Sequence, residues 1–389
     1  MRKVVTIGDL GEVITGKTPP KSNKNFYGDY AVFIKPTDIS EDHKYTYETE
    51  EMYSQLAAEQ YKSSLVPKGA VCVPCIGTIG TKMTMTHCAC YTNQSINSIV
   101  CNENYDNEYV YYLIKNFLPG LKAYNLGTAS GREYVSKSNF ELIEIEAEQD
   151  KNTQHRIATI LSRYDSLIEN YQKQIKLLEE AAQRLYKEWF IDLHFPGHEN
   201  TKIIDGVPEG WEKKKVGDIA EFKRGKTITK KDIVEGDVPV VAGGLEPAYY
   251  CNKHNTASRV ITISGSGANA GFTRLYYENV WASDCSFADT NTTKWLHFVY
   301  CFLQSSKSAI DNMQKGAAQP HVYAKDINAL DIIVPEAELL SGFEDLVSSY
   351  FNNVQSLQSQ LRLLTEARDR LLPKLMSGEL TLEARAEEE

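Results

Sequence analysis

Two long segments of the chain carry apolar residues in steps that alternate between four and three positions. This spacing is the heptad pattern of a coiled-coil seam, so it predicts one long helix within residues 151–195 and another within 341–380. The predicted seam residues are Ile157, Leu161, Tyr164, Ile168, Tyr171, Ile175, Leu178, Leu185 and Trp189 in the first helix, and Phe343, Val347, Tyr350, Val354, Leu357, Leu361, Leu364 and Leu371 in the second. Arg368 interrupts the second stripe, and Pro373 is expected to disturb its last turn.

The remaining segments, residues 1–150 and 196–340, alternate short apolar runs with turns and predict mixed α+β domains. Each is also expected to contain one helix, near residues 108–117 and 295–305. The expected strands are Ala31–Ile34, Ala70–Val73 and Ser98–Val100 in the first domain, and Val238–Val241, Arg259–Ile263 and Asp331–Val334 in the second.

The two halves of the chain repeat each other in order, which indicates a duplication. Three stretches match at decreasing offsets, as expected for a second copy that is shorter in its middle. The first match pairs residues 7–18 with 216–227. The second pairs Gly127 to Ala129 with Gly316 to Ala318, Tyr134 with Tyr323, and Ile143 with Ile332. The third pairs residues 174–181 with 360–367.

Connectivity predicts how the helices pair. The second domain begins where the first helix ends, and the second helix begins where that domain ends, so the two helices are expected to run antiparallel. The predicted fold is two similar α+β domains joined by an antiparallel coiled coil, with pseudo-two-fold symmetry. A helix of about 37 residues is about 55 Å long, which is enough to separate two domains by a set distance. The alternative, that each helix belongs to the core of its own domain, is less compatible with so long and narrow a stripe.

Composition limits the classes of function. A net charge of −10 argues against a nonspecific basic coat for nucleic acid, although it does not exclude a local basic surface. No apolar run is long enough to predict a transmembrane helix, and no secretory signal is recognisable at the N-terminus, so a cytoplasmic location and no membrane association are expected. The eight cysteines are therefore expected to be reduced.

Two local patterns resemble nucleotide or metal sites without the expected context. Residues 11–18 satisfy the P-loop spacing, but Pro19 and Pro20 follow where a helix must begin. Cys72, Cys75, Cys88 and Cys90 could supply zinc thiolates, but the second copy does not repeat them. We therefore expect no metal, no nucleotide and no catalytic residue in this chain, since its histidines also form no recognisable triad.

The order domain, helix, domain, helix resembles the specificity subunit of type I DNA restriction-modification enzymes. The resemblance covers essentially the whole chain and is most specific in the helices. It is carried by Gly8-Asp9, Gly16–Pro19, Phe33–Ile39, Gln154–Ser162, Leu185–Phe190 and Arg370–Glu379. It implies that residues 1–150 and 196–340 are target-recognition domains, that residues 151–195 and 341–380 are spacer helices, and that 381–389 form an acidic tail.

The resemblance also implies partners and cofactors. Such a subunit binds double-stranded DNA, two methyltransferase (M) subunits, and restriction (R) subunits through them. S-adenosylmethionine, ATP and Mg²⁺ are then expected on the partner subunits and none on this chain. Because the two domains differ in sequence, the target is expected to be bipartite and asymmetric, with half-sites about one helical turn, or 34 Å, apart.

Candidate DNA contacts are cationic, amide and hydroxyl side chains in loops, because these bind phosphates or base edges. They are Lys17, Thr18, Lys35, Lys82, Asn93, Gln94 and Arg132 in the first domain, and Lys223, Arg224, Lys226, Lys230, Lys231, Ser266, Asn269, Arg274, Gln319 and His321 in the second. The dense basic run from Lys223 to Lys231 is the strongest candidate. The alternative function is a two-headed scaffold that binds proteins, which the acidic net charge favours slightly.

Overall fold

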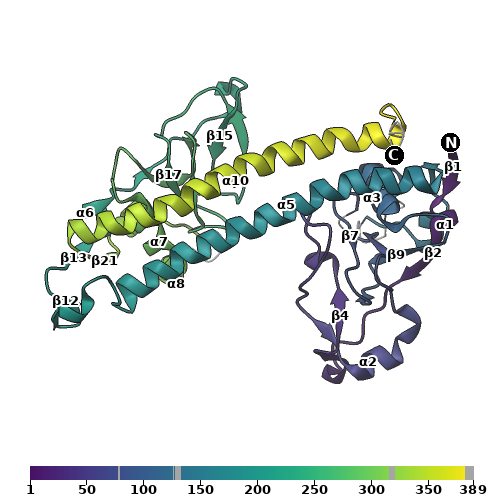
Figure 1. Ribbon diagram of the computed structural model, residues 1–389, viewed down its shortest axis with the longest axis horizontal. Helices are drawn as coiled ribbons and strands as arrows, with labels where there is room; N and C mark the ends of the chain where they lie inside the picture. The colour runs from purple at the N-terminus through teal and green to yellow at the C-terminus, as the bar shows by residue number, and fades with distance from the viewer. Residues whose placement is uncertain (78, 126, 128–132, 315–319, 382–389) are drawn as a thin grey trace, which may run out of the picture. The chain divides into compact units, whose positions relative to one another are not determined.

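The computed structural model describes residues 1–77, 79–125, 127, 133–314 and 320–381, apart from the side chain of Lys230 (Figure 1). The chain divides into two compact units. Unit 1 contains Met1–Tyr171 and Gln360–Glu389, and unit 2 contains Gln172–Ser359. Each long helix therefore contributes one of its halves to each unit. No helix among the described residues is long and apolar enough to span a membrane.

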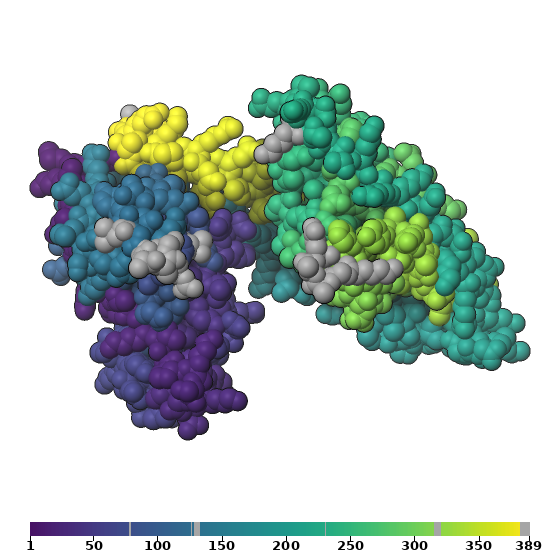
Figure 2. All heavy atoms as spheres, turned by 180° about the vertical axis from the view of Figure 1, so that it is seen from behind, coloured from purple at the N-terminus to yellow at the C-terminus, as the bar shows by residue number. Residues whose placement is uncertain are grey.

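Unit 1 contains an antiparallel strand pair and two four-stranded sheets. The pair joins β1 (Arg2–Thr6) to β10 (Glu144–Glu148). The first sheet has the order β2 (Gly11–Thr15), β9 (Ile96–Cys101), β6 (Val71–Pro74) and β7 (Thr84–Met85). The second has the order β3 (Tyr27–Gly28), β5 (Met52–Tyr53), β4 (Ala31–Ile34) and β8 (Tyr91–Thr92), and only its β4–β8 pair is parallel. The short helices are α1 (Ile7–Leu10), α2 (Gln55–Gln60), α3 (Asn107–Phe117) and α4 (Lys137–Glu141). Strands β3–β5 and α2 form a purple lobe that projects from the rest of unit 1 (Figure 2).

Unit 2 repeats this arrangement. Its strand pair is β13 (Glu212–Lys215) with β21 (Asp331–Val334), and its first sheet has the order β14 (Lys223–Arg224), β20 (Cys285–Asp289), β17 (Val260–Ser264) and β18 (Thr273–Tyr276). Its second sheet has the order β16 (Tyr249–Cys251), β15 (Val238–Val241) and β19 (Trp281–Ala282), again with a parallel β15–β19 pair. Its helices are α6 (Val216–Ile219), α7 (Leu296–Ser305), α8 (Lys307–Asn312) and α9 (Ala324–Asn328), and a hairpin joins β11 (Ile203–Ile204) to β12 (Val207–Pro208). The prediction of two similar α+β domains is confirmed.

One of the three sequence matches behind the duplication is wrong by two residues. The backbone N–H of Ile7 donates to the carbonyl of Ile143, and the equivalent N–H of Val216 donates to Leu330, both at 2.9 Å. Ile143 therefore corresponds to Leu330 and not to Ile332. The identity of two side chains suggested the wrong pairing, whereas backbone contacts define the correct one. The Gly127 to Ala129 match with residues 316–318 lies largely outside the described residues.

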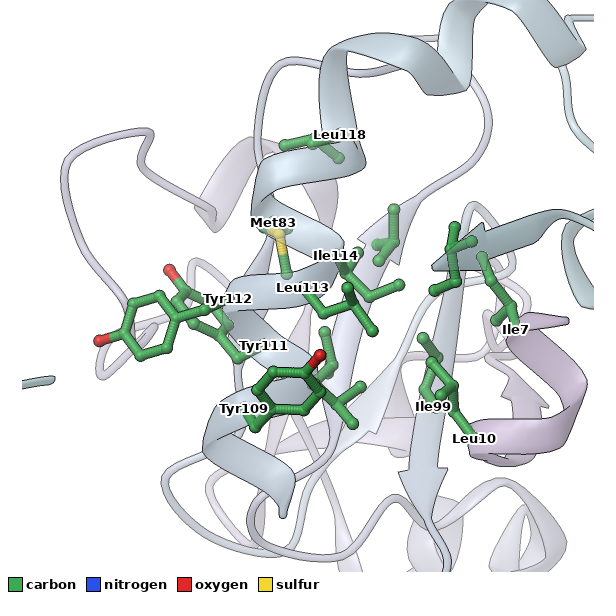
Figure 3. Packing of buried hydrophobic residues seen from close by; sticks show 14 of the residues in the cluster. Ile7, Leu10, Met83, Ile99, Tyr109, Tyr111, Tyr112, Leu113, Ile114 and Leu118 are labelled. Atoms are coloured by element: carbon green, nitrogen blue, oxygen red, sulfur yellow. The ribbon is translucent and has the colours of Figure 1, made fainter. Parts of the chain in front are cut away.

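Helix α3 supplies the apolar centre of unit 1. Asp106 caps its N-terminus by accepting a hydrogen bond from the N–H of Tyr109 at 3.0 Å. Leu113 and Ile114 then face the sheet that carries Ile99, as Figure 3 shows. Each such side chain contributes about 1.5–3 kcal/mol when it is fully buried. This core fixes the sheet whose strand ends carry the candidate contacts.

The long helices α5 (Lys151–Tyr186) and α10 (Ala337–Ser377) pair in opposite directions. In unit 1, the start of α5 and the end of α10 share one core, through Ile157 and Leu375. In unit 2, Tyr186 at the end of α5 lies beside Phe343 near the start of α10, with ring centroids 6.1 Å apart. A π-helical turn, Lys187–Ile191, extends α5 and places the ring centroid of Trp189 5.9 Å from that of Phe343. The antiparallel pairing predicted from connectivity is confirmed.

The predicted seam faces inward along both helices, and none of its residues is exposed. The seam residues Ile157, Leu161, Ile168, Trp189, Phe343, Val347 and Val354 are buried, whereas Tyr164, Tyr171, Ile175, Leu178, Leu185, Tyr350, Leu357, Leu361, Leu364 and Leu371 are half-buried. On the helix surfaces, Glu366 pairs with Arg370 at 3.8 Å, and Glu180 pairs with Lys176 at 3.9 Å.

Arg368 does not interrupt the seam, which corrects the sequence interpretation. Its guanidinium Nη1 lies 2.8 Å from Oδ1 of Asp165 on α5, and the Tyr112 hydroxyl donates to Oδ2 of the same carboxylate at 2.6 Å. Burial opposes the charge of Arg368, but the hydrogen bond and charge of Asp165 outweigh it and keep the pKa of the guanidinium raised. Burial and the Asp165 carboxylate raise the pKa of Tyr112, so its hydroxyl stays protonated and donates.

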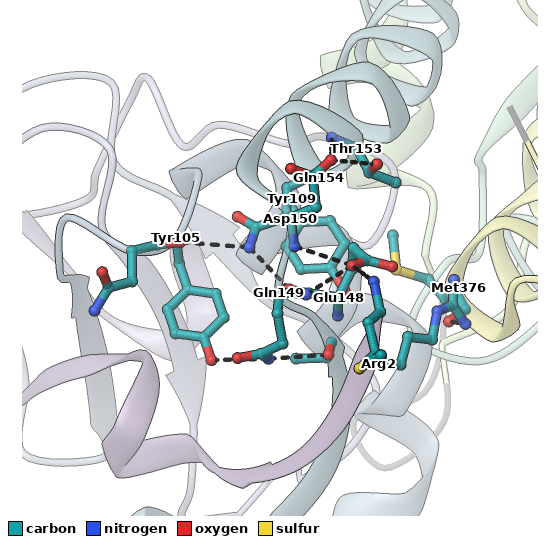
Figure 4. Close-up of polar contacts among 12 residues, drawn as sticks. Arg2, Tyr105, Tyr109, Glu148, Gln149, Asp150, Thr153, Gln154 and Met376 are labelled. Atoms are coloured by element: carbon teal, nitrogen blue, oxygen red, sulfur yellow. Dashed lines mark hydrogen bonds and ion pairs between the residues drawn. The ribbon is translucent and has the colours of Figure 1, made fainter. Parts of the chain in front are cut away.

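Pro373 does not end α10, contrary to expectation. The helix continues to Ser377 because its last turn is held from outside. Leu375 and Met376 are buried in the core of unit 1, and the guanidinium of Arg2 donates to the carbonyl oxygens of both residues (Figure 4). A cation at a helix C-terminus also interacts favourably with the helix dipole. Tertiary contacts therefore compensate for the hydrogen bond that proline cannot donate.

Candidate nucleic-acid interface

Four chain segments meet at one edge of the sheets in unit 1, and we call them rim 1: residues 16–19, 75–77, 93–95 and 133–135. Backbone hydrogen bonds join them. The N–H of Lys17 donates to Thr92 at 2.9 Å, the N–H of Cys75 to Ser95 at 2.7 Å, and the N–H of Gly77 to Glu133 at 3.0 Å. Rim 1 thus brings together the turn after β2, the loop after β6 and the turn after β8.

Unit 2 builds the same edge from residues 225–227, 264–267, 283–284 and 320–322, which we call rim 2. The N–H of Lys226 donates to Ala282 at 2.9 Å, the N–H of Gly265 to Asp284 at 3.1 Å, and the N–H of Gly267 to Pro320 at 3.1 Å. These three bonds correspond to the three in rim 1. The duplication has therefore kept the backbone frame of the rims while their side chains differ.

The Gly-Lys turn at each rim is fixed by the backbone that crosses it. A Cβ at Gly16 would overlap the carbonyl oxygens of Thr92 and Asn93, and one at Gly225 would overlap those of Ala282 and Ser283. Only glycine fits at these crossings. The residues that resemble a P-loop are thus strand β2 followed by a structural turn, and no helix begins at Lys17, since the next helical turn is the 3-10 turn Lys24–Phe26.

The lysine after each glycine is held by its backbone and exposes its side chain. The Tyr53 hydroxyl donates to the carbonyl of Lys17 at 2.6 Å, and Nε1 of Trp281 donates to that of Lys226 at 2.7 Å. Neither lysine forms an ion pair with any residue that the structure describes. Each rim therefore offers one exposed, uncompensated cation at a matched position.

The structure brings four predicted contacts of the first domain together in rim 1. Lys17 and Thr18 lie beside Asn93 and Gln94, since the Thr18 hydroxyl donates to Oε1 of Gln94. Two other predicted contacts lie elsewhere. Lys82 is half-buried in the loop between β6 and β7. The charge of Lys35 is compensated by neighbouring carboxylates.

Lys35 belongs to an internal ion-pair cluster. Its ammonium lies 2.6 Å from Glu50 and 3.0 Å from Glu51, and only 16% of its side chain is exposed. Burial alone would lower its pKa, but hydrogen bonds to both carboxylates raise it. Lys35 therefore has less charge to offer a phosphate than Lys17.

In rim 2 the structure places Lys226, Ser266 and His321. Ser266 and His321 form a single antiparallel bridge, and the His321 ring stacks on Tyr323 with centroids 5.9 Å apart. Arg132 and Gln319 lie outside the described residues, as does the side chain of Lys230.

The basic run of the second domain is spread over separate elements. Lys223 and Arg224 form β14, and Lys231 belongs to a 3-10 turn (Lys230–Asp232). Lys223 lies 3.9 Å from Glu221, so part of its charge is compensated. Density along the sequence therefore does not produce one cationic cluster, although the described basic side chains of the run are exposed.

Asn269 and Arg274 line a groove of about 1170 Å³ in unit 2, which lies between α5 and the β18 to α8 region. The Arg274 guanidinium donates to the carbonyl of Leu245 at 2.9 Å and lies 3.2 Å from the Glu246 carboxylate. Its charge is therefore engaged within the unit.

Sequence reasoning missed Asp284, which lies in rim 2. Its Oδ2 accepts a hydrogen bond from the Ser266 hydroxyl. Residues 91–96 align with residues 281–285 when one deletion is allowed. This alignment would have shown that the turn contains an acidic residue in the second copy and only uncharged residues in the first.

The thiols of Cys72 and Cys75 and the ring of His297 are buried. Burial raises the pKa of the Cys72 and Cys75 thiols to about 12, which disfavours the thiolate that zinc requires. The described residues contain no group of three or more side chains that could hold a metal ion. Nδ1 of buried His297 lies 2.7 Å from Glu344, and its Nε2 faces Arg259 at 3.3 Å, so both ring nitrogens are occupied.

Comparison with known proteins gives one consistent family. The family described as "Type I restriction modification DNA specificity domain" matches residues 2–180 and 208–340. The specificity subunit of the type I restriction enzyme MjaIX from Methanocaldococcus jannaschii is 28% identical over 98% of this chain and 94% of its own length. That of HindI from Haemophilus influenzae is 37% identical, over 36% of this chain and 30% of its own length.

A solved structure shares the fold. The crystal structure of a type I restriction-modification S subunit from M. genitalium superposes with a TM-score of 0.63 at 20% identity, covering 96% of both chains.

Proposed function

The chain belongs to the family of type I restriction-modification DNA specificity proteins, and from that premise we propose that it reads a bipartite, asymmetric duplex with rims 1 and 2. The observation that carries this proposal is the matched pair of rims. Their backbone frames agree, whereas the side chains on them differ, as expected of two readers with different targets. Each rim would then read one half-site.

Lys17 and Lys226 are proposed to contact phosphates. They are exposed at matched positions and lack an internal counter-ion among the described residues, and phosphate contacts orient a protein without reading sequence. A contact that is common to both rims is expected to serve this general role. The net charge of −10 does not conflict with it, because the two cations are local.

Replacing Lys17 and Lys226 together with alanine should weaken binding to every DNA sequence and reduce its salt dependence. Each lost phosphate contact lowers the slope of log K against log salt concentration by about one unit. Fluorescence anisotropy of the complex with its methyltransferase subunits, measured across a salt series, tests this. Lys68→Ala is the matched control, because Lys68 is exposed at the opposite end of β6. An unchanged affinity and slope for the double variant would contradict the assignment.

We propose that this chain supplies recognition and that partner subunits supply the chemistry. In this proposal two methyltransferase subunits bind S-adenosylmethionine, and restriction subunits, bound through them, use ATP and Mg²⁺. The occupied nitrogens of His297 and the protonated, buried thiols are consistent with a chain that is not itself catalytic.

Two matched apolar patches are proposed to dock the methyltransferase subunits. Leu177 is 53% exposed and lies one turn from Ala181 on α5, and Leu363 is 61% exposed and lies one turn from Ala367 on α10. Each unit contains one patch, so two copies of one partner can bind in the same way. A single exposed leucine is common on a protein surface, so the support for this proposal is its recurrence at matched positions in both units.

Leu177→Glu and Leu363→Glu are each expected to remove one of the two methyltransferase subunits, and the double variant both. Folding should change little because both side chains are exposed. Light scattering of the purified complex measures its composition. Leu167→Glu is the control, because Leu167 is 43% exposed on α5 and has no apolar counterpart at Asn353. A double variant that still binds two methyltransferase subunits would exclude these patches.

A further inference from the structure

The turn that follows β8 in rim 1 and β19 in rim 2 differs between the units although its anchors agree. After the turn, the backbone N–H of Gly16 donates to the carbonyl of Ile96 at 3.2 Å in rim 1. The N–H of Gly225 likewise donates to the carbonyl of Cys285 at 2.8 Å in rim 2. Before the turn, the backbone N–H of Lys17 donates to the carbonyl of Thr92, and that of Lys226 donates to the carbonyl of Ala282. Between these anchors rim 1 has Asn93, Gln94 and Ser95, and rim 2 has only Ser283 and Asp284. The duplication has thus exchanged the side chains of this turn on a fixed frame.

In rim 1 this turn presents hydrogen-bond donors. Oδ1 of Asn93 accepts from the N–H of Ser95 at 3.0 Å, and Oε1 of Gln94 accepts from the Thr18 hydroxyl. Both side-chain oxygens are therefore used to hold the turn. The amide NH₂ groups of these side chains are donors that can contact a ligand.

In rim 2 the same turn presents an acceptor. Asp284 is half-buried, and its carboxylate forms no ion pair with any lysine or arginine in the described part of the chain. The Ser266 hydroxyl donates to its Oδ2, which orients the group and leaves Oδ1 with acceptor capacity. The need to neutralise a neighbouring cation therefore does not explain why an acidic residue stands at position 284.

Among the described residues, the backbone beside Ser266 is open at Gly267. A Cβ at Gly267 would meet nothing within 4 Å, and Gly267 has a φ of +81°, which a side chain would strain. Gly243 packs against the carbonyl of Ser266, which fixes the serine that orients the carboxylate. Glycines at such positions allow a base edge to approach the backbone.

A carboxylate near a duplex is repelled by the phosphates, so it is compatible with binding only where it reaches a hydrogen-bond donor on a base. Among base edges in the major groove, the N4 amino group of cytosine is the donor that aspartate and glutamate characteristically bind. Adenine presents its amino group beside the N7 acceptor, which suits an amide side chain better.

We propose that Asp284, oriented by Ser266, accepts a hydrogen bond from the N4 amino group of a cytosine. The half-site read by rim 2 then contains a C·G base pair at a position that Asp284 specifies. Rim 1 carries donors in the corresponding place, so it selects a different base there. This inference rests on the proposed function, because it requires rim 2 to face DNA.

Methylation mapping with the complete complex tests the assignment. The wild-type motif should contain a C·G pair in the half-site assigned to unit 2. Asp284→Ala should reduce discrimination at that one position by about 5- to 150-fold and leave the other half-site unchanged. Asp284→Asn keeps the shape and adds a donor, so it should shift the preference at that position toward adenine. Asp237→Ala is the control, because Asp237 is exposed immediately before β15.

The results separate this assignment from the proposed function. A defined motif without a C·G pair in the half-site assigned to unit 2 would overturn the role of Asp284 alone, and so would an unchanged motif in both Asp284 variants. A wild-type complex that modifies no defined sequence would overturn the proposed function and this assignment with it. Relaxation at one C·G position in Asp284→Ala, with Gln94→Ala altering only the other half-site, would support both.

Discussion

Arg368→Met is expected to lower the free energy of unfolding by about 3–5 kcal/mol, because it leaves a buried carboxylate without its counter-ion. Only 6% of the Asp165 side chain and 11% of the Arg368 side chain are exposed. After the substitution, the Tyr112 hydroxyl would still donate a hydrogen bond to Asp165. Denaturant unfolding measures the change.

The duplicated half of the seam provides a matched test of this expectation. The positions equivalent to Asp165 and Arg368 are Phe351 and Ala182, both buried in the apolar core of unit 2. Replacing Asp165 with phenylalanine and Arg368 with alanine, together with Tyr112→Phe, should restore most of the lost stability, since an apolar set can replace a buried ion pair. Arg370→Met is the control and should change stability by less than about 0.5 kcal/mol, because its side chain is 82% exposed. A loss below about 1 kcal/mol for Arg368→Met would contradict the account of the seam.

Lengthening both helices by one heptad is expected to widen the unread gap of the DNA target by about three base pairs. One heptad adds about 10 Å of helix, and B-DNA rises about 3.4 Å per base pair. Tandem duplication of residues 173–179 in α5 and of residues 354–360 in α10 preserves the steps of four and three in both seams. The half-sites should not change, because neither rim is altered.

A duplication in one helix alone is the control for this experiment. It would add seven residues, two of them seam residues, without opposite partners in the other helix, so the complex should lose stability and methylation. Methylation mapping of the double duplication gives the gap directly. An unchanged gap with intact half-sites would show that the helices do not set the distance.

The sequence predicted the long helices well because their heptad spacing depends on local periodicity. The strands Ala31–Ile34, Val238–Val241 and Asp331–Val334 were predicted with the bounds that the structure has. The pairing direction followed from connectivity alone. In contrast, Arg368 was read as an interruption because its partner, Asp165, lies on the other helix, and Tyr112, which also donates to Asp165, lies on α3. No periodicity within one helix can reveal such a set.

The candidate interface was less predictable for the same physical reason. Lys17 and Lys226 were found because they are cationic and follow a glycine that is repeated in both copies of the sequence. The compensation of Lys35 by Glu50 and Glu51 depends on a loop fold that residue type does not encode. Asp284 was missed because cationic and amide side chains were sought for DNA contacts, whereas its role depends on Ser266, which lies on another loop.

The sequence motif modified by the wild-type complex tests the central claim most directly, namely that two unlike units read two separate half-sites. Co-expression of this chain with its methyltransferase subunit, followed by methylation mapping, supplies that motif. The account predicts two different half-sites separated by a fixed number of unspecified base pairs. A single uninterrupted motif, or two identical half-sites, would contradict it.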